Sequence, residues 1–197
     1  FVGNWGFSII LVTMLVRMVL LPTNISSFKS MRNMSKLNPI MKDIREKYKD
    51  DPQKRNTEIM ALYKQHKVNP VGGCLPMLLQ IPVFFALYQV LGRSIDLYQA
   101  PFIFWIQDLS AKDPYFVLPV LMGITMFFQQ KMTPSTMEPA QQKMFMFMPL
   151  FFSFLMASLP SGLTLYMFVS GLFGIIQQLI LTRSKTEDVN DPKVVTI

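Results

Sequence analysis

The sequence predicts an all-α membrane protein with five transmembrane helices, a cytoplasmic helical hairpin and an interfacial helix. Three observations support this fold class. Of the 197 residues, 51% are hydrophobic, with 17 Phe and 16 Met, and the mean hydropathy is +0.32. The apolar residues gather in several runs, the longer of which approach the roughly 20 residues that a membrane-spanning helix needs. The basic residues gather mainly between the first two runs.

The first predicted span, residues 1–28, contains the apolar stretch WGFSIILVTMLVRMVLLPTNISSF. Arg17 lies near its middle, where a charged side chain costs about 2.5–3.5 kcal/mol on insertion scales. Thr13, Arg17 and Asn24 are spaced by four and seven residues, which places them on one face of a continuous helix. A charge kept at that cost indicates a functional site, whereas a side chain reaching to the membrane surface is the structural alternative.

Residues 29–69 predict a cytoplasmic helical hairpin, because apolar residues recur there every three or four positions within charged sequence. Between residues 28 and 69 there are 11 Lys/Arg and 5 Asp/Glu. Asp50 or Asp51, followed by Pro52, is a typical start for the second helix. Flexible thioethers suit surfaces that adapt to many partners, although methionine at helical spacing also packs in cores. The candidate residues for such an adaptable surface are Met34, Met41 and Met60.

The rest of the chain alternates apolar and polar segments. A second span is expected at residues 70–92, and the aromatic-rich residues 93–114 predict an extracytoplasmic helix lying on the membrane surface. Residues 115–182 predict the third, fourth and fifth spans, at about 115–130, 144–159 and 163–181. Residues 183–197 are expected to form a cytoplasmic tail.

The basic residues predict the orientation of these spans, because cytoplasmic loops carry an excess of Lys and Arg. The hairpin, the loop holding Lys131 and Lys143, and the basic end of the fifth span are therefore expected in the cytoplasm. The N-terminus of this chain is expected outside and its C-terminus inside. Because the sequence begins with Phe1 rather than Met, we expect a piece from which an N-terminal part has been removed.

Most predicted spans carry one or two polar side chains on a single face. If these faces converge, they enclose a polar groove with one fixed positive charge, although polar groups also join membrane helices to one another. The apolar spans contain no Asp or Glu to pair with Arg17, which leaves water, lipid phosphate or an acidic group of a ligand. The predicted groove residues are Thr13, Arg17, Asn24, Gln80, Gln129, Tyr166, Ser170 and Gln177.

The sequence does not predict an enzyme, a metal or a cofactor. The apolar spans contain no Asp, Glu or His to act as a general base, and no hydrolase or phosphate-loop motif occurs. The single cysteine, Cys74, and the single histidine, His66, cannot form a disulfide or a metal site. Because the net charge of +7 lies largely in one loop, we do not predict sequence-specific nucleic-acid binding.

Four stretches closely resemble the bacterial YidC-type membrane protein insertases, in particular their five-helix core. They are NPVGGCLPMLLQIPVFFALYQVL, APFIFWIQDLSAKDPYFVLPVLMGITMFFQQKM, FMPLFFSF and LPSGLTLYMFVSGLFGIIQQ. An arginine in the first span with a threonine four residues earlier also matches, and the similarity covers about residues 1–184. The resemblance implies a groove that is open to the cytoplasm and to lipid and closed on the outer side. In it, Arg17 would attract acidic substrate residues, and Thr13 and Tyr166 match positions of substrate contact.

The resemblance further implies an insertase and chaperone for newly made membrane proteins, located in the bacterial inner membrane and acting alone or with the Sec translocon. The implied partners are nascent membrane proteins, the ribosome, the Sec translocon and membrane lipids, with the signal recognition particle receptor as a further candidate. No cofactor is implied. The alternative function is a small channel or a lipid scramblase that uses the same groove, and an intramembrane hydrolase is a more distant one.

Overall fold

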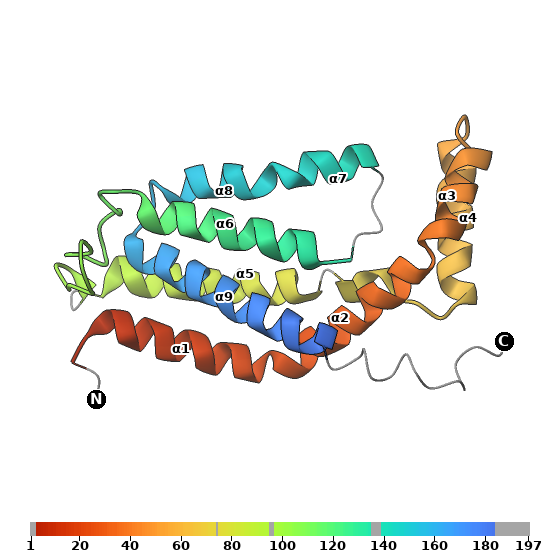
Figure 1. Ribbon diagram of the computed structural model, residues 1–197. Helices are drawn as coiled ribbons and strands as arrows, with labels where there is room; N and C mark the ends of the chain where they lie inside the picture. Colours follow the sequence, from red (N-terminus) through yellow and green to blue (C-terminus); the bar gives the residue numbers. More distant parts are fainter. Residues whose placement is uncertain (1–2, 74, 95–96, 135–138, 184–197) are drawn as a thin grey trace. The chain divides into compact units, whose positions relative to one another are not determined.

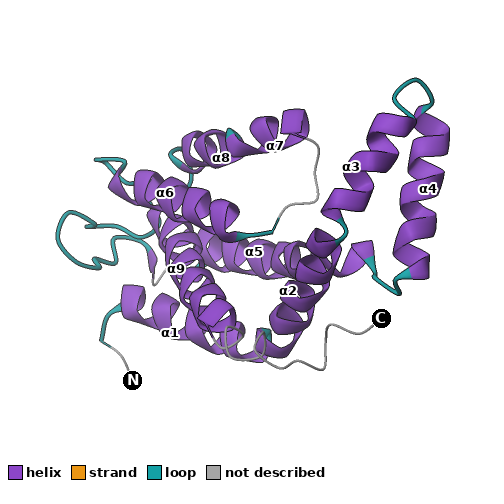
Figure 2. Cartoon of the chain, turned by 45° about the vertical axis from the view of Figure 1, so that its right-hand side comes forward, coloured by secondary structure: helices purple, strands orange, loops and turns teal. Residues whose placement is uncertain are grey.

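The computed structural model describes residues 3–73, 75–94, 97–134 and 139–183, and these residues form helices joined by loops (Figures 1 and 2). They contain no β-strand, which confirms the predicted all-α class. The chain divides into two compact units. The first comprises residues 1–19, 86–133 and 143–197, and the second comprises residues 20–85 and 134–142. The predicted tail, from residue 184 onward, lies outside the described residues.

The first unit is a row of packed helices in which α9 (Ser161–Arg183) is central. One side of α9 packs against α1 (Trp5–Val19) and another against α6 (Val117–Met132). In turn, α6 packs against α8 (Met148–Met156), as Figure 1 shows. The side chains buried completely in this row include Thr13 and Met122.

The outer faces of these helices expose large apolar side chains. On α8, Phe154 is 80% exposed and Leu150 is 71% exposed, and on α1, Met18 is 68% exposed. Soluble monomers rarely expose contiguous apolar patches larger than a few hundred Å². The exposed faces are therefore explained by contact with lipid.

The five predicted spans are only partly reproduced by helix length. Two described helical segments are long and apolar enough to cross a membrane, Leu75–Arg93 (α5) and Ser161–Thr182 within α9. A third span results if α1 and α2 (Leu21–Lys36) count as one bent span. The 16 residues of α6 extend about 24 Å, which is less than the roughly 30 Å of a hydrocarbon core. The count of five therefore stays a prediction.

The first predicted span is not one continuous helix. The helix is interrupted at Leu20, with α1 ending at Val19 and α2 beginning at Leu21. Pro22, in the first turn of α2, explains the interruption, because proline lacks an N–H and its ring clashes with the preceding turn. The prediction that Asn24 shares one helix face with Arg17 is therefore wrong.

The fourth predicted span is also interrupted. Its residues form the end of α7 (Pro139–Met146) and the whole of α8, with Phe147 between them. Pro149 stands at the start of α8, so a second proline accounts for a second interruption.

The second unit contains α2, the hairpin helices α3 (Asn38–Lys47) and α4 (Pro52–Gln65), the short 3-10 helix η1 (Pro70–Gly73) and the beginning of α5. In it, α3 packs against α4 around buried Leu37, Met41 and Leu62. The first hairpin helix begins at Asn38, because α2 continues to Lys36 and Pro39 opens the next helix.

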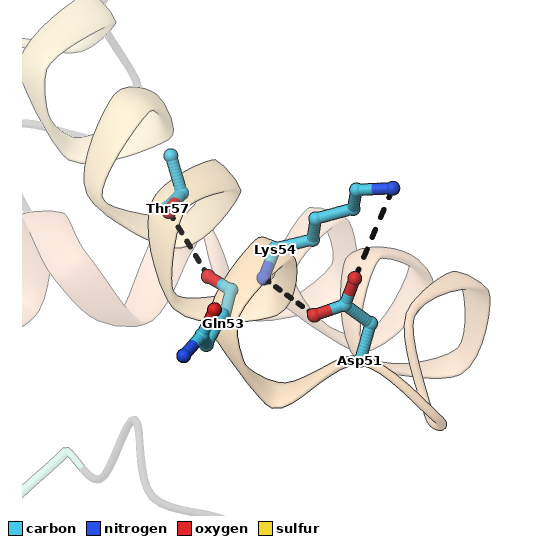
Figure 3. Close-up of polar contacts among 4 residues, drawn as sticks. All are labelled: Asp51, Gln53, Lys54 and Thr57. Atoms are coloured by element: carbon cyan, nitrogen blue, oxygen red, sulfur yellow. Dashed lines mark hydrogen bonds and ion pairs between the residues drawn. The ribbon is translucent and has the colours of Figure 1, made fainter.

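The start of α4 has the predicted cap. The Asp51 side chain accepts a hydrogen bond of 3.0 Å from the Lys54 N–H and lies 3.8 Å from the Lys54 ammonium (Figure 3). In the next turn the Thr57 hydroxyl donates to the Gln53 carbonyl at 2.9 Å. Pro52 occupies the first turn, where its missing N–H leaves no broken hydrogen bond.

We expect Asp51→Ala to destabilise the hairpin by about 1 kcal/mol, the usual cost of losing an N-cap side chain. Hydrogen exchange of the amides in the first turn of α4 measures this effect. Asp50→Ala is the matched control, since the capping oxygen belongs to Asp51. Equal exchange in both variants would contradict the capping role.

Described residues 97–116 form turns and irregular loop, with 3-10 geometry only at residue 97, so the interfacial helix predicted within residues 93–114 is not found among them. We call residues 97–116 the connecting loop. Three of its residues, Gln99, Phe104 and Phe116, have positive φ angles of 55°, 54° and 57°, which interrupt any helix. The carboxylates of Asp108 and Asp113 accept hydrogen bonds from nearby backbone N–H groups, and such bonds compete with helix formation.

Candidate functional site

Arg17 is held between α1 and α9. Its Nε donates a hydrogen bond of 2.8 Å to the Ser170 hydroxyl, and the side chain is half-buried. No carboxylate forms an ion pair with Arg17 among the residues that the structure describes. A guanidinium carries five N–H donors in a fixed fork, so the Nη groups remain for a ligand, lipid or water.

Thr13 and Tyr166 lie one helical turn away from this pair. Thr13 precedes Arg17 by four residues and is fully buried, with its hydroxyl donating to the Ile9 carbonyl at 2.6 Å. Tyr166 precedes Ser170 by four residues and is 2% exposed. These four predicted residues therefore lie at or beside the packed contact of α1 with α9, where only Arg17 keeps substantial exposure.

Gln129 lies on the other side of α9, in its contact with α6. Its Nε2 donates a hydrogen bond of 3.2 Å to the Gly171 carbonyl. A Cβ added to Gly174 would stand 1.8 Å from the same nitrogen, and one added to Gly171 would stand 2.9 Å from the Thr125 hydroxyl. Here the polar residues join two closely packed helices. This is the structural alternative to a polar groove, because polar side chains also link helices within membranes.

A pocket of about 330 Å³ opens beside Gln129, among the ends of α6, α8 and α9. Sequence reasoning missed three of its polar residues, Gln130, Thr133 and Gln178. Of the neighbouring glutamines on α9, Gln178 is the more buried at 8% exposure, whereas the predicted Gln177 is intermediate. The sequence contains two pairs of adjacent glutamines, Gln129-Gln130 and Gln177-Gln178. The helical spacing used to choose the groove residues selects only one glutamine of each pair. The lining residues are Met126, Gln129, Gln130, Thr133, Met148, Pro149 and Gln178.

The connecting loop closes one end of the helix row. The Ser161 and Gly162 N–H groups, at the start of α9, donate to loop carbonyls at 2.7 and 2.9 Å. The Ser161 hydroxyl donates to the Asp108 carbonyl at 2.9 Å. At the start of α1, Asn4 donates from Nδ2 to the Phe102 carbonyl at 2.9 Å. The loop thus satisfies helix-terminal N–H groups that would otherwise lack partners.

A buried carboxylate organises this loop. Asp113, which is 2% exposed, accepts hydrogen bonds from the Trp105 indole N–H at 3.0 Å, the Tyr115 N–H at 3.1 Å and the Leu118 N–H at 2.8 Å. It therefore connects the middle of the loop to the first turn of α6. No local pattern in the sequence indicates this role.

The Asp108 carboxylate belongs to the same loop. Burial alone would raise its pKa, but hydrogen bonds from the Ser110 hydroxyl and from nearby backbone N–H groups favour the charged form. The pKa of Asp108 is consequently below its usual 3.8. A carboxylate with a lowered pKa stabilises the fold above the unfolded-state pKa and loses that contribution as the pH falls through its folded-state pKa.

We expect the loop to lose stability as the pH falls below 3.8 and through the lower folded-state pKa of Asp108, because the hydrogen-bonded carboxylate then takes up a proton. Trp105 fluorescence during denaturant unfolding, repeated across this range, reports the change. Asp108→Asn removes the titrating group and should give a flatter pH dependence. A pH dependence identical in the variant and the parent would refute the role of Asp108.

The remaining predicted residues belong to the second unit. Asn24 has its Nδ2 atom buried with no hydrogen-bond partner in the described part of the chain, and Gln80 is half-buried on α5. Met41 is fully buried and accepts a hydrogen bond from the Tyr63 hydroxyl at 3.1 Å. Met34 is 7% exposed, whereas Met60 is 50% exposed. The expectation that all three methionines form an adaptable surface is wrong for Met34 and Met41, which pack inside this unit.

Comparison with known proteins identifies the family. A sequence model of the family described as "60Kd inner membrane protein" matches residues 1–188. The chain is 55% identical over 184 residues to the membrane protein insertase YidC of Geobacter sulfurreducens, covering 93% of this chain and 35% of that protein. It is 56% identical over 182 residues to YidC of Francisella tularensis subsp. novicida, covering 92% and 33% respectively.

A solved structure supports the same relationship. The crystal structure described as an active YidC insertase with the first transmembrane domain resolved matches with a TM-score of 0.72 and 31% sequence identity, over 90% of this chain and 41% of that one. The chain spans about a third of the length of the curated relatives it matches. The resemblance seen in the sequence is confirmed, and this chain belongs to the 60Kd inner membrane protein family, which it shares with the YidC insertases.

Proposed function

We propose that this chain inserts newly made membrane proteins into the bacterial inner membrane, with Arg17 as the residue that receives the polar part of the substrate. The observation that carries the proposal is the half-buried guanidinium between α1 and α9. The Ser170 hydroxyl accepts a hydrogen bond from only one N–H group of this guanidinium. A charge in an apolar helix pair is costly, and an acidic substrate side chain would offset that cost when it arrives.

The mechanism needs no nucleotide and no metal. A polar path around Arg17 shortens the distance over which a hydrophilic substrate tail crosses hydrocarbon. The apolar segment of the substrate then moves sideways into lipid, and burial of its surface from water supplies about 0.8 kcal/mol per CH₂ group. The exposed apolar faces of α1 and α9 are compatible with such lateral release.

The remaining predicted residues enter as extensions of this proposal. Gln129, Gln177, Asn24 and Gln80 are proposed as further polar residues that contact the substrate, and Met60 would offer an exposed thioether on the hairpin. The hairpin and the loop of residues 131–143 would face the cytoplasm, where basic residues are favoured, with the N-terminus outside. The ribosome, the Sec translocon and the signal recognition particle receptor are proposed partners on the cytoplasmic side and in the membrane.

We expect Arg17→Ala to lose most of the ability to support insertase-depleted cells, whereas Arg17→Lys retains it, because the proposal requires a positive charge rather than a guanidinium. Growth and insertion of a small single-span protein with an acidic translocated tail are the measurements. Normal insertion by Arg17→Ala would refute the proposed role of the charge. Ion conductance or lipid flipping by the purified protein in liposomes, without any substrate, would favour the channel or scramblase alternative instead.

A further inference from the structure

Ser170 holds the Arg17 guanidinium from the facing helix. Its hydroxyl accepts the 2.8 Å hydrogen bond from the Arg17 Nε, and the serine itself is 2% exposed in the packed contact of α9 with α1. Arg17, in contrast, is only half-buried. The acceptor is therefore fixed by helix packing, whereas the long side chain that donates to it keeps an open side.

This hydrogen bond opposes a movement that arginine commonly makes in membranes. Arg17 stands in the last turn of α1, and long basic side chains within a membrane tend to extend toward the surface, where the charge meets water. Such an extension would take the charge away from the contact of α1 with α9. Because Nε is part of the rigid planar guanidinium, an acceptor at Nε keeps the whole charged group at the depth of Ser170.

The same hydrogen bond decides which edge of the guanidinium can receive a carboxylate. A guanidinium offers two pairs of parallel N–H groups for a two-bonded carboxylate contact. One pair is formed by Nε and one Nη atom, and the other by the two Nη atoms. Since the Arg17 Nε already donates to Ser170, a carboxylate can form two parallel hydrogen bonds only with the two Nη atoms. The acidic group is thereby given one direction of approach.

A second hydroxyl at this contact is bonded differently. The Thr13 hydroxyl donates to the Ile9 carbonyl at 2.6 Å, a bond within one helix that is usual for serine and threonine. Ser170 instead accepts a hydrogen bond from a different helix, from a residue 153 positions away in the sequence. Its contact with Arg17 is therefore a feature of the assembled helix pair and not a local helix bond.

We propose that Ser170 is a positioning residue, which holds the Arg17 guanidinium at a fixed depth and leaves its two Nη atoms for the substrate. Arg17 then receives a carboxylate best at one place along the translocated tail. This inference rests on the proposed function, because it concerns how Arg17 selects an acidic group. The favoured substrates are tails with a carboxylate at a defined distance from their transmembrane segment, rather than acidic tails of any pattern.

The test places a single aspartate at successive positions of an otherwise uncharged translocated tail. The purified protein in liposomes inserts each substrate and its asparagine counterpart, and the ratio of the two gives the benefit of the carboxylate at that position. We expect one position of greatest benefit for the parent protein. Ser170→Ala should lower this maximum about threefold, as for the loss of one ordinary hydrogen bond, and should spread the benefit over neighbouring positions. Insertion of the asparagine substrates should stay at the parental level, whereas a purely structural role of Ser170 would lower it too.

Ser170→Thr keeps the hydroxyl and should keep the parental position of greatest benefit. Thr182→Val is the matched control, because it removes from the same helix a hydroxyl that donates to the Gln178 carbonyl at 2.8 Å; it should leave the profile unchanged. A Ser170→Ala profile identical to that of the parent would overturn this inference and leave the role of Arg17 intact, even if Ser170→Thr does not fold. No benefit of aspartate at any position in the parent would overturn both the inference and the proposed role of Arg17.

Discussion

Asp113→Ala should destabilise the protein by about 3 kcal/mol or more, because it removes the carboxylate that serves three donors at once. The Leu118 N–H in the first turn of α6 would then be left buried without a partner, which costs about 1–3 kcal/mol, and the half-buried Trp105 indole N–H would lose its acceptor. Because the loop also satisfies the first N–H groups of α9, the loss should spread to both helix ends.

Thermal unfolding in detergent, followed by Trp105 fluorescence, measures this effect. Asp113→Asn keeps one acceptor oxygen and should fall between the parent and Asp113→Ala. Asp43→Ala removes an exposed carboxylate on α3 and should change stability by less than about 0.5 kcal/mol. An unfolding midpoint of Asp113→Ala equal to that of the parent would show that this carboxylate does not hold the loop.

Gly6→Ala is expected to have the second large effect on stability, about 1–3 kcal/mol from overpacking. A Cβ at Gly6 would lie 2.0 Å from the Phe102 ring. The ring cannot simply withdraw, because its backbone is fixed by hydrogen bonds to Ile106 and Asn4 and its edge contacts Phe7 with centroids 5.5 Å apart. The loop must therefore separate from the start of α1.

Gly3→Ala provides the matched control, since the same methyl group at Gly3 meets no atom within 4 Å. Thermal unfolding and protease cleavage within the connecting loop are the measurements. Gly6→Ala should unfold at lower temperature and be cleaved faster, whereas Gly3→Ala should behave as the parent. If both variants behave alike, the loop is not fixed to α1 through Phe102.

Much of the fold could be predicted from the sequence because local signals determine it. The Asp51-Pro52 start of α4 is such a signal, since a capping side chain and a proline act within one turn. The interruptions at Leu20 and Phe147 were missed although Pro22 and Pro149 mark them. Their apolar surroundings favoured long uninterrupted spans, and prolines within membrane helices are often tolerated.

The missing interfacial helix has a different cause. Its aromatic composition suits a membrane surface, but the loop conformation depends on Asp113 reaching α6 and on Ser161 and Gly162 reaching back from α9. These partners are distant in the sequence, so a local pattern cannot indicate them. The prediction of a helix from the aromatic composition is therefore wrong.

The candidate site was predictable in part. Arg17 could be identified because a charge in an apolar run has few structural explanations, and its α9 partner Ser170 was among the predicted polar residues. The separate contact of Gln129 with Gly171 could not be foreseen, because it depends on how closely α6 approaches α9. Asn24 was misplaced because its position assumed a helix that continues past Pro22.

The most direct test of the central claim measures insertion into liposomes by Arg17 variants, with two substrates that differ in the charge of the translocated tail. The substrates are a single-span protein with an acidic translocated tail and the same protein with each tail carboxylate changed to its amide. We expect Arg17→Ala to reduce insertion of the acidic substrate about tenfold, as for one lost charge-assisted contact, and to affect the neutral substrate little. Arg17→Lys should restore insertion of the acidic substrate. An equal reduction for both substrates, or none for either, would contradict the claim that the charge of Arg17 receives acidic residues.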